Sequence, residues 1–219
     1  MSQRAFNQNI ENHYPITVMD RQYSNLSKLN KGLYSLIETF ESNDKNTNKN
    51  AVKSGKITTS GGFQTSLDLN LFDSNNVYIQ ELKSDIILPS IKTYLNEVFE
   101  KESETIIPEV VGWSNILEAG DWQRPHMHPT VNNLASGCYY IHVPELTGKE
   151  EGRIEFINPM PVSVHHGYSN TRRITPETGK LLLFPPYYNH FVHPLKSKGK
   201  RIMIAFDVIA VQPKTQFVF

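Results

Sequence analysis

Two short stretches of the sequence carry side chains that suit a metal ion. The first is Pro-His-Met-His-Pro at residues 125–129, and the second contains His190. In an extended strand, side chains two residues apart point to the same face, so His126 and His128 can converge on one point. His190 would then arrive from another strand as a third ligand. Neutral imidazoles suit iron, and zinc accepts the same nitrogens, so these residues predict a metal site and leave the metal open.

The composition narrows the classes of protein to which the chain can belong. Its 22 basic and 22 acidic residues cancel, so there is no global field that would gather nucleic acid or an anionic membrane surface. Cys138 is the single cysteine, which excludes an intramolecular disulfide and a cysteine-rich zinc site. No run of about eighteen apolar residues occurs, and the amino terminus does not resemble a signal peptide. We therefore expect a soluble, cytoplasmic protein with no membrane segment and no strong nucleic-acid signal.

The amino-terminal half of the sequence predicts helices. Apolar residues recur at three- and four-residue steps over residues 24–40, which is typical of an amphipathic helix packed on a sheet. A second helical pattern covers residues 77–99 and could be broken before Pro89. The polar stretch at about residues 43–62 predicts a mobile loop, because it cannot bury enough surface to offset its ordering entropy. Residues 1–105 are therefore expected to form a helical flank.

The pattern changes after Pro108. Short β-branched and aromatic runs, separated by Gly, Pro and Asn, predict an antiparallel sandwich or barrel. These runs are VVGWSNIL, ASGCYYIHV, GRIEFIN, KLLLFPP and RIMIAFDVIAV. Helices first and strands afterwards indicate an α+β protein in which helices cover one face of a sheet. We expect a single domain, 1–219, with its β core at residues 106–219.

Several motifs in this half resemble, in order and spacing, those of the 2-oxoglutarate/Fe(II) oxygenase superfamily. They are WSN at 113–115, PHMHP at 125–129, SGCYY at 136–140, LFPPYYNHFVHP at 183–194 and RIMIAF at 201–206. Within the superfamily they look most like a prolyl-hydroxylase-like branch known from bacterial and phage genomes. The resemblance covers about half of the chain. It implies a double-stranded β-helix, a jelly-roll and cupin-like core, flanked by the amino-terminal helices.

The resemblance also implies a role for each matched residue. His126 and His190 would hold Fe(II), and Arg201 would bind the far carboxylate of the cosubstrate 2-oxoglutarate. A guanidinium suits this role because its planar fork matches a carboxylate, although its head could instead reach solvent at the end of the strand. Tyr140 resembles a tyrosine that donates its hydroxyl to the same carboxylate, or it is a core aromatic residue. Asn115 could direct its amide into the cavity beside the keto acid, or pair with backbone.

His128 departs from the usual superfamily pattern, which is His-x-Asp or His-x-Glu. Three outcomes are open: His128 binds iron, water replaces the carboxylate, or the site is altered or inactive. The branch looks to have histidine here, so we expect His128 to be the third metal ligand, which would leave the Fe(II) site with one more positive charge. Glu155 and Asp121 are weaker candidates for a carboxylate ligand. His193 competes with His190, but the two residues face opposite sides of their strand.

We therefore expect a non-haem Fe(II)- and 2-oxoglutarate-dependent dioxygenase, a hydroxylase that acts with dioxygen on a small-molecule or peptidyl substrate. The alternative is a catalytically silent, metal-binding β-helix that serves as a binding module. A zinc hydrolase would need a positioned general base, and the sequence names none. A homodimer is a further possibility, since the closing stretch VIAVQPKTQFVF is apolar. If a phage encodes the chain, the expected compartment is the host cytoplasm.

Overall fold

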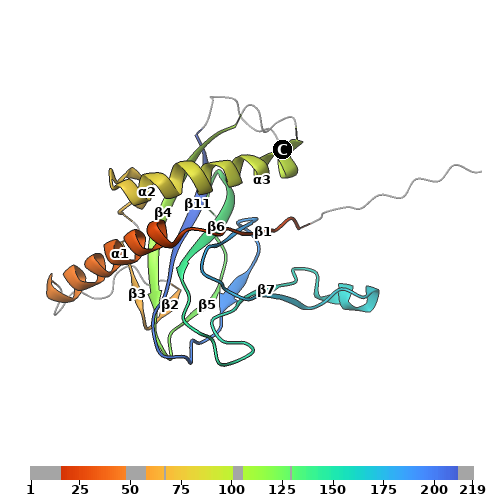
Figure 1. Cartoon of the computed structure of the whole chain (residues 1–219). Coiled ribbons are helices and arrows are strands. Elements are labelled where there is room, and N and C mark those ends of the chain that lie inside the picture. The colour runs from red at the N-terminus through yellow and green to blue at the C-terminus, as the bar shows by residue number, and fades with distance from the viewer. Residues whose placement is uncertain (1–15, 48–57, 67, 101–105, 129, 212–219) are drawn as a thin grey trace, which may run out of the picture.

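The structure is a computed structural model that describes residues 16–47, 58–66, 68–100, 106–128 and 130–211 (Figure 1). This part of the chain forms two antiparallel sheets, with helices against one of them. The strands are β1 (Met19–Gln22), β2 (Thr59–Ser60), β3 (Phe63–Gln64), β4 (Ile107–Leu117), β5 (Trp122–His126), β6 (Asn133–His142), β7 (Ile154–Ile157), β8 (Thr171–Ile174), β9 (Lys180–Phe184), β10 (His190–Val192) and β11 (Arg201–Val211).

The two sheets divide the strands of the second half of the chain equally. The larger sheet has the order β1-β9-β6-β11-β4-β3, and the smaller sheet has the order β2-β5-β10-β7-β8. Strands β4, β6, β9 and β11 thus lie in the larger sheet, and β5, β7, β8 and β10 lie in the smaller one. The hairpin between β7 and β8 projects from the body of the molecule (Figure 1). The predicted α+β class with antiparallel sheets is confirmed.

Helices cover the outer face of the larger sheet. They are α1 (Ser27–Thr47), η1 (Leu71–Asp73), α2 (Val77–Glu81), the π-helix η2 (Leu82–Ile87) and α3 (Leu88–Phe99), while η4 (Pro161–His166) lies in the projecting hairpin. The helix expected at 24–40 begins at Ser27 and continues to Thr47. No helix in the described ranges is long and apolar enough to cross a bilayer.

Pro89 does not break the second helical run, which is continuous from α2 to α3. Proline lacks an N–H, and its ring would clash with a carbonyl one turn earlier in an α-helix. Here the turn before Pro89 is the wider π-helix η2, and the N–H of Leu88 reaches back to the carbonyl of Lys83. Pro89 then stands in the first turn of α3, where no N–H is required.

The larger sheet is buried on both faces. On one face, Ile202 and Ile204 of β11 pack in an apolar cluster with Leu33 of α1. On the other face, Met203 and Ala205 pack toward the smaller sheet. Because side chains alternate along a strand, one strand contributes residues both to the cluster under the helices and to the cluster between the two sheets. Strand β11 can therefore carry core residues on its helix side and site residues on its inner side.

Two features of the amino-terminal half differ from the expectation. The expected helical flank, residues 1–105, also supplies strands: β1 pairs with β9, β2 with β5 and β3 with β4. The expected mobile loop at 43–62 is helical up to Thr47 and extended at 59–60, and residues 48–57 lie outside the described residues. Strands this short show no period-two pattern, and their partners are far away in the sequence, so a local pattern cannot reveal them.

A buried carboxylate joins two loops near the start of β11. Glu151 is 2% exposed, and its carboxylate accepts the backbone N–H groups of Thr147, Gly148, Lys196 and Ser197. Burial alone would raise the pKa of Glu151, but the hydrogen bonds, those from Ser197 first, lower that pKa to about 2. Glu151 thereby fixes the backbone that leads into β11.

We predict that Glu151→Gln lowers the free energy of unfolding by about 1–3 kcal/mol at pH 7, because an amide cannot satisfy all of these donors. A carboxyl whose pKa is depressed in the fold stabilises it above the ordinary pKa of 4.5, and this contribution is lost as the pH falls toward 2. The difference between variant and natural chain should therefore shrink from pH 7 to pH 4 in urea unfolding. Glu145→Gln, which changes an exposed carboxylate nearby, is the matched control. An equal decrease in the free energy of unfolding of both variants, or a decrease that does not depend on pH, would contradict this role.

Candidate metal centre

Three histidines from two neighbouring strands meet between the sheets. His126 at the end of β5 lies directly opposite His190 at the start of β10, and His128 lies just beyond β5. The ring centroids are 4.3 Å apart for His126 and His190, 5.2 Å for His126 and His128, and 5.3 Å for His128 and His190. One ligand atom of each residue lies within 4.8 Å of the others. The structure thus brings the three predicted ligands together at a spacing that a single ion can bridge.

The Nδ1 atom of each imidazole already faces an acceptor. His126 Nδ1 lies 2.6 Å, and His190 Nδ1 lies 2.9 Å, from the backbone carbonyl oxygen two residues earlier. His128 Nδ1 lies 3.1 Å from Oδ1 of Asp207. A carbonyl or ionised carboxylate oxygen only accepts, so Nδ1 carries the proton and Nε2 keeps its lone pair. Outer acceptors of this kind orient histidines that bind metals.

Burial keeps two of the rings neutral. Desolvation lowers the pKa of His126 to about 4 and that of His190 to about 3, and the backbone hydrogen bonds oppose this only in part. His190 is 4% exposed. Both imidazoles are therefore neutral at pH 7, which is the form that binds a metal ion.

Aromatic rings restrict how the histidines can turn. Trp113 stacks on His128 with ring centroids 5.9 Å apart and an interplanar angle of 22°. Phe184 meets the ring of His190 edge-on at 4.8 Å, and Phe156 lies 5.6 Å from it. The imidazoles are thus held by both hydrogen bonds and packing, which is how a preorganised ligand set is built.

Arg201, the first residue of β11, is a fully buried cation. Its Nη2 donates to the Tyr140 hydroxyl at 3.3 Å, and its Nη1 lies 3.6 Å from Sδ of Met203. Its Nε has no hydrogen-bond partner, and no acidic residue in the described part of the chain is paired with the guanidinium. A buried charge with no counter-charge is costly. The position therefore suits an anionic ligand that matches the planar fork of a guanidinium.

Tyr140 and Asn115, the other two predicted cofactor-binding residues, are also fully buried. The Tyr140 ring lies beneath the Arg201 guanidinium, 4.8 Å from its carbon, and burial raises the pKa of Tyr140, so its hydroxyl keeps its proton. Asn115 lies opposite Gln64 of β3 and Met203 of β11 in the larger sheet. Both of these neighbours line the cavity between the sheets that is described next, although Asn115 itself does not. Neither the nitrogen nor the oxygen of its amide has a hydrogen-bond partner. The alternative of an amide paired with backbone is therefore wrong.

One cavity of about 350 Å³ joins these groups, a size within the usual range for small-molecule sites. The three histidines, Arg201 and Tyr140 all line it. Its apolar lining includes Ile154, Phe184, Val192, Met203 and Ala205. A single apolar space thus holds a cluster of ligand nitrogens and an unpaired cation. It suits a metal ion together with an anion that reaches from the ion to Arg201.

The remaining candidates from the sequence lie elsewhere. His193 Nε2 and Arg173 Nε bond the same oxygen of Glu155, at 2.5 and 2.7 Å. His193, Glu155 and Glu150 form a second group of closely spaced ligand atoms. Arg173 pairs with both of these carboxylates, so the group is an ion-pair network. The Asp121 carboxylate accepts a backbone N–H of its own turn, and neither it nor Glu155 joins the three histidines.

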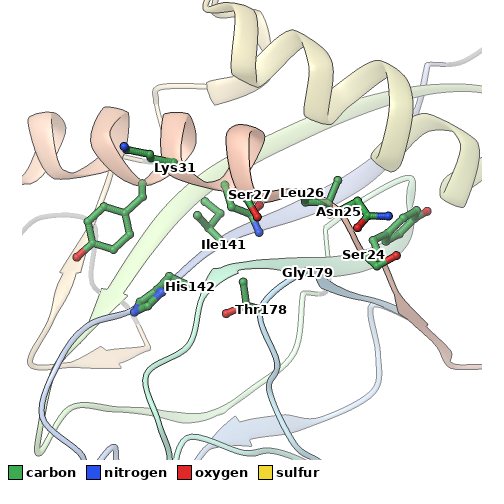
Figure 2. Close-up of a pocket in the computed structure, with 12 residues that line it drawn as sticks. Ser24, Asn25, Leu26, Ser27, Lys31, Ile141, His142, Thr178 and Gly179 are labelled. Carbon is green, nitrogen blue, oxygen red and sulfur yellow. The ribbon is translucent and has the colours of Figure 1, made fainter.

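A second cavity, of about 470 Å³, lies between the start of α1 and the end of β6 (Figure 2). Ser27, Lys31, His142 and Thr178 line it. His142 meets the ring of Tyr34 edge-on, with the centroids 5.4 Å apart. This cavity offers one imidazole, and none of its described lining residues has a buried polar atom without a partner. It therefore lacks the features of a metal centre.

Residues 112–207 match the model of a family described as "Putative 2OG-Fe(II) oxygenase". Over this segment, which is somewhat less than half of its length, the chain is similar to the 2OG-Fe(II) oxygenases. The matched segment runs from β4 to β11 and contains all of the predicted site residues. This confirms the resemblance seen in the motifs. No match was found among curated proteins.

Several solved structures share the fold of this chain. A prolyl-4-hydroxylase from Pseudomonas putida is 10% identical, with 89% of this chain and 93% of that chain covered and a TM-score of 0.61. A prolyl hydroxylase in complex with a hypoxia inducible factor peptide fragment, from Trichoplax adhaerens, is 13% identical (88% and 83% covered, TM-score 0.60). HygX from Streptomyces hygroscopicus, with nickel and 2-oxoglutarate bound, is 11% identical (90% and 83% covered, TM-score 0.58). At these identities the likeness shows the fold alone.

Asp207 also lines the cavity that holds the three histidines, although it is not among the residues that the sequence predicts for the site. It lies on the same face of β11 as Arg201 and Met203, so the alternation that starts at Arg201 carries a signal for it. Its contact with His128 joins strand β11 to the segment after β5. A pattern within one strand cannot show such a contact.

We predict that the metal-free protein holds His126, His128 and His190 in the Nδ1–H form. Long-range ¹H–¹⁵N NMR spectra distinguish a protonated ring nitrogen from a bare one. The rings of His126 and His190 should remain neutral from pH 7 to pH 5.5, because their pKa values are about 4 and 3. His142→Asn, outside the site, should leave the three signals in place. Nε2–H signals, or protonation of either buried ring near pH 6.5, would contradict the geometry.

Proposed function

We propose that this protein is an Fe(II)- and 2-oxoglutarate-dependent hydroxylase that acts with dioxygen on a peptidyl or small-molecule substrate. One observation carries the proposal: an apolar cavity holds three clustered imidazoles and a fully buried, unpaired guanidinium. That combination suits a metal ion and a dicarboxylate that chelates it. The family match over residues 112–207 supports the same function.

His126, His128 and His190 would hold the metal through their Nε2 atoms, since each Nδ1 is engaged by an acceptor. A facial set of three protein ligands leaves positions open for a bidentate keto acid and dioxygen. When bound, Fe(II) and 2-oxoglutarate supply the oxygen chemistry that converts a C–H bond to C–OH. The contribution of the protein is to hold the three rings neutral and correctly turned.

Arg201 would bind the far carboxylate of 2-oxoglutarate through its guanidinium, whose Nε–H has no other partner. The Tyr140 hydroxyl accepts from Arg201 and can donate its own proton to the same carboxylate. The unpaired amide of Asn115 would lie beside the keto acid. An anion at this position would neutralise the buried charge of Arg201 and so remove its desolvation cost.

Apolar side chains would keep water away from the inner part of the cavity, and the substrate would enter at its outer part. Ile154, Val192 and Met203 line the inner part, while Met127 is exposed at the edge of the same cavity. Two structures with this fold contain ligands of different classes, a peptide fragment in one and hygromycin B in the other. Both a peptidyl and a small-molecule substrate therefore belong to the proposal.

The proposal includes the architecture of the chain. Residues 106–219 would form a double-stranded β-helix, in which four strands of each sheet enclose the catalytic cavity. Residues 1–105 would flank it within a single domain, 1–219. Supporting this, the helices share one apolar cluster with the larger sheet, and β1, β2 and β3 extend both sheets.

We predict that anaerobic addition of Fe(II) and then 2-oxoglutarate to the natural chain gives the weak visible absorption of the iron chelate. Arg201→Gln should retain Fe(II) but should need a 2-oxoglutarate concentration at least about 30-fold higher to reach the same absorption. The reason is that a buried charge pair contributes about 2 kcal/mol or more to the binding free energy. Arg172→Gln, which changes an exposed arginine on β8, is the matched control and should need no more 2-oxoglutarate than the natural chain.

A natural chain that is loaded with Fe(II) and gives no absorption with 2-oxoglutarate would contradict the proposed function. Equal 2-oxoglutarate affinity in the natural chain and in Arg201→Gln would instead favour a metal-binding module that lacks a cosubstrate site.

A further inference from the structure

Asp207 places a carboxylate inside a largely apolar strand. In the register of the larger sheet it lies between Val111 of β4 and Ser136 of β6. Its side chain is 14% exposed and lines the same cavity as the three histidines. A partly buried carboxylate is costly unless its charge is used or compensated. The partners of Asp207 therefore indicate what it does.

Two polar contacts of the Asp207 carboxylate converge on one oxygen. Ser136 Oγ donates to Asp207 Oδ1 at 2.6 Å, and His128 Nδ1 lies 3.1 Å from the same atom. Asn133 Nδ2 donates at 3.2 Å to Ser136 Oγ and, also at 3.2 Å, to the backbone carbonyl of His128. Among the described residues, His128 is the one ionisable group that pairs with this carboxylate. The network thus fixes both the ring and the backbone of His128.

The three imidazoles differ in what holds them. His126 and His190 give their Nδ1 protons to neutral backbone carbonyls, whereas His128 faces an acidic residue. Non-haem Fe(II) oxygenase sites commonly combine two histidines with one carboxylate, whereas the three ligands proposed here include no carboxylate. A divalent ion with three neutral ligands keeps a net charge of about two, and one adjacent carboxylate reduces it to about one. A carboxylate on the far side of a ligating imidazole also makes that imidazole a stronger donor.

We propose that Asp207 supplies, through His128, the negative charge that a directly bound carboxylate would otherwise bring to this metal centre. It acts as a positioning residue, because its carboxylate lies outside the group of ligand atoms that meet within 4.8 Å. Trp113, stacked on His128, restricts the rotation of the ring whose Nδ1 lies 3.1 Å from Asp207 Oδ1, which leaves Nε2 for a metal ion. The inference rests on the proposed function, since it requires His128 to be a ligand.

The test is the affinity of the metal-free full chain for Co(II), measured by competition with a chelating dye. Asp207→Asn keeps the shape of the side chain and an acceptor for His128, but removes the charge. We expect it to weaken Co(II) binding about 10- to 100-fold. Asp85→Asn removes an exposed carboxylate from η2 and should leave Co(II) affinity as it is. Circular dichroism and thermal unfolding of each variant show that the fold is retained.

Repeating the Asp207→Asn substitution in a His128→Asp variant distinguishes an effect of charge that acts through His128 from a general effect on the structure. His128→Asp provides a carboxylate ligand directly, so adding Asp207→Asn to it should leave Co(II) affinity unchanged or raise it. An equal loss from Asp207→Asn in both backgrounds would overturn the inference. If Asp207→Asn and the natural chain bind Co(II) with equal affinity, the inference is also overturned, but the proposed function is unaffected. If the natural chain binds no Co(II), or binds it equally after His190→Ala, the proposed function fails and the role of Asp207 fails with it.

Discussion

The pairing of β5 with β10 is the interaction on which the rest of the site depends. Its register sets His126 directly opposite His190, and a slip of one residue would turn either ring to the other face of the sheet. The same backbone supplies the carbonyl oxygens that hold both Nδ1 atoms, so the orientation of the rings comes from local chain geometry. Burial between the sheets then keeps both imidazoles neutral. The position, tautomer and charge of these two imidazoles thus follow from the pairing of two short strands.

Strand β11 organises the opposite wall of the cavity. It pairs with β4 and β6 along most of its length, so its side chains are fixed from both sides. Its alternation sends Ile204 and Phe206 to the helices and Arg201 and Asp207 to the cavity. The two charged residues do not pair with each other. The Nε of Arg201 has no hydrogen-bond partner, and the Asp207 carboxylate lies 3.1 Å from His128. In the proposed function each of the two charges would have its own partner, an anion for Arg201 and the His128 imidazole for Asp207.

The sequence predicts the parts of this site that lie within one strand or one motif. The two-residue spacing in PHMHP predicts that His126 and His128 converge, and the motif resemblance points to His190 and Arg201. The helices also follow from local periodicity. Strands β1, β2 and β3 do not, because so few residues show no period and their pairing depends on distant strands. Asp207 is recognised only after the sheets pack, since its significance comes from the imidazole that it meets.

A crystal structure of the full chain with a divalent metal ion and an oxalyl analogue of 2-oxoglutarate would test the proposed metal and cosubstrate sites together. We predict an ion bound by Nε2 of His126, His128 and His190 and chelated by the analogue, with the far carboxylate of the analogue on the Arg201 guanidinium. An ion bound instead at Glu150, Glu155 and His193 would contradict this prediction. An analogue whose far carboxylate lies away from Arg201 would contradict it equally.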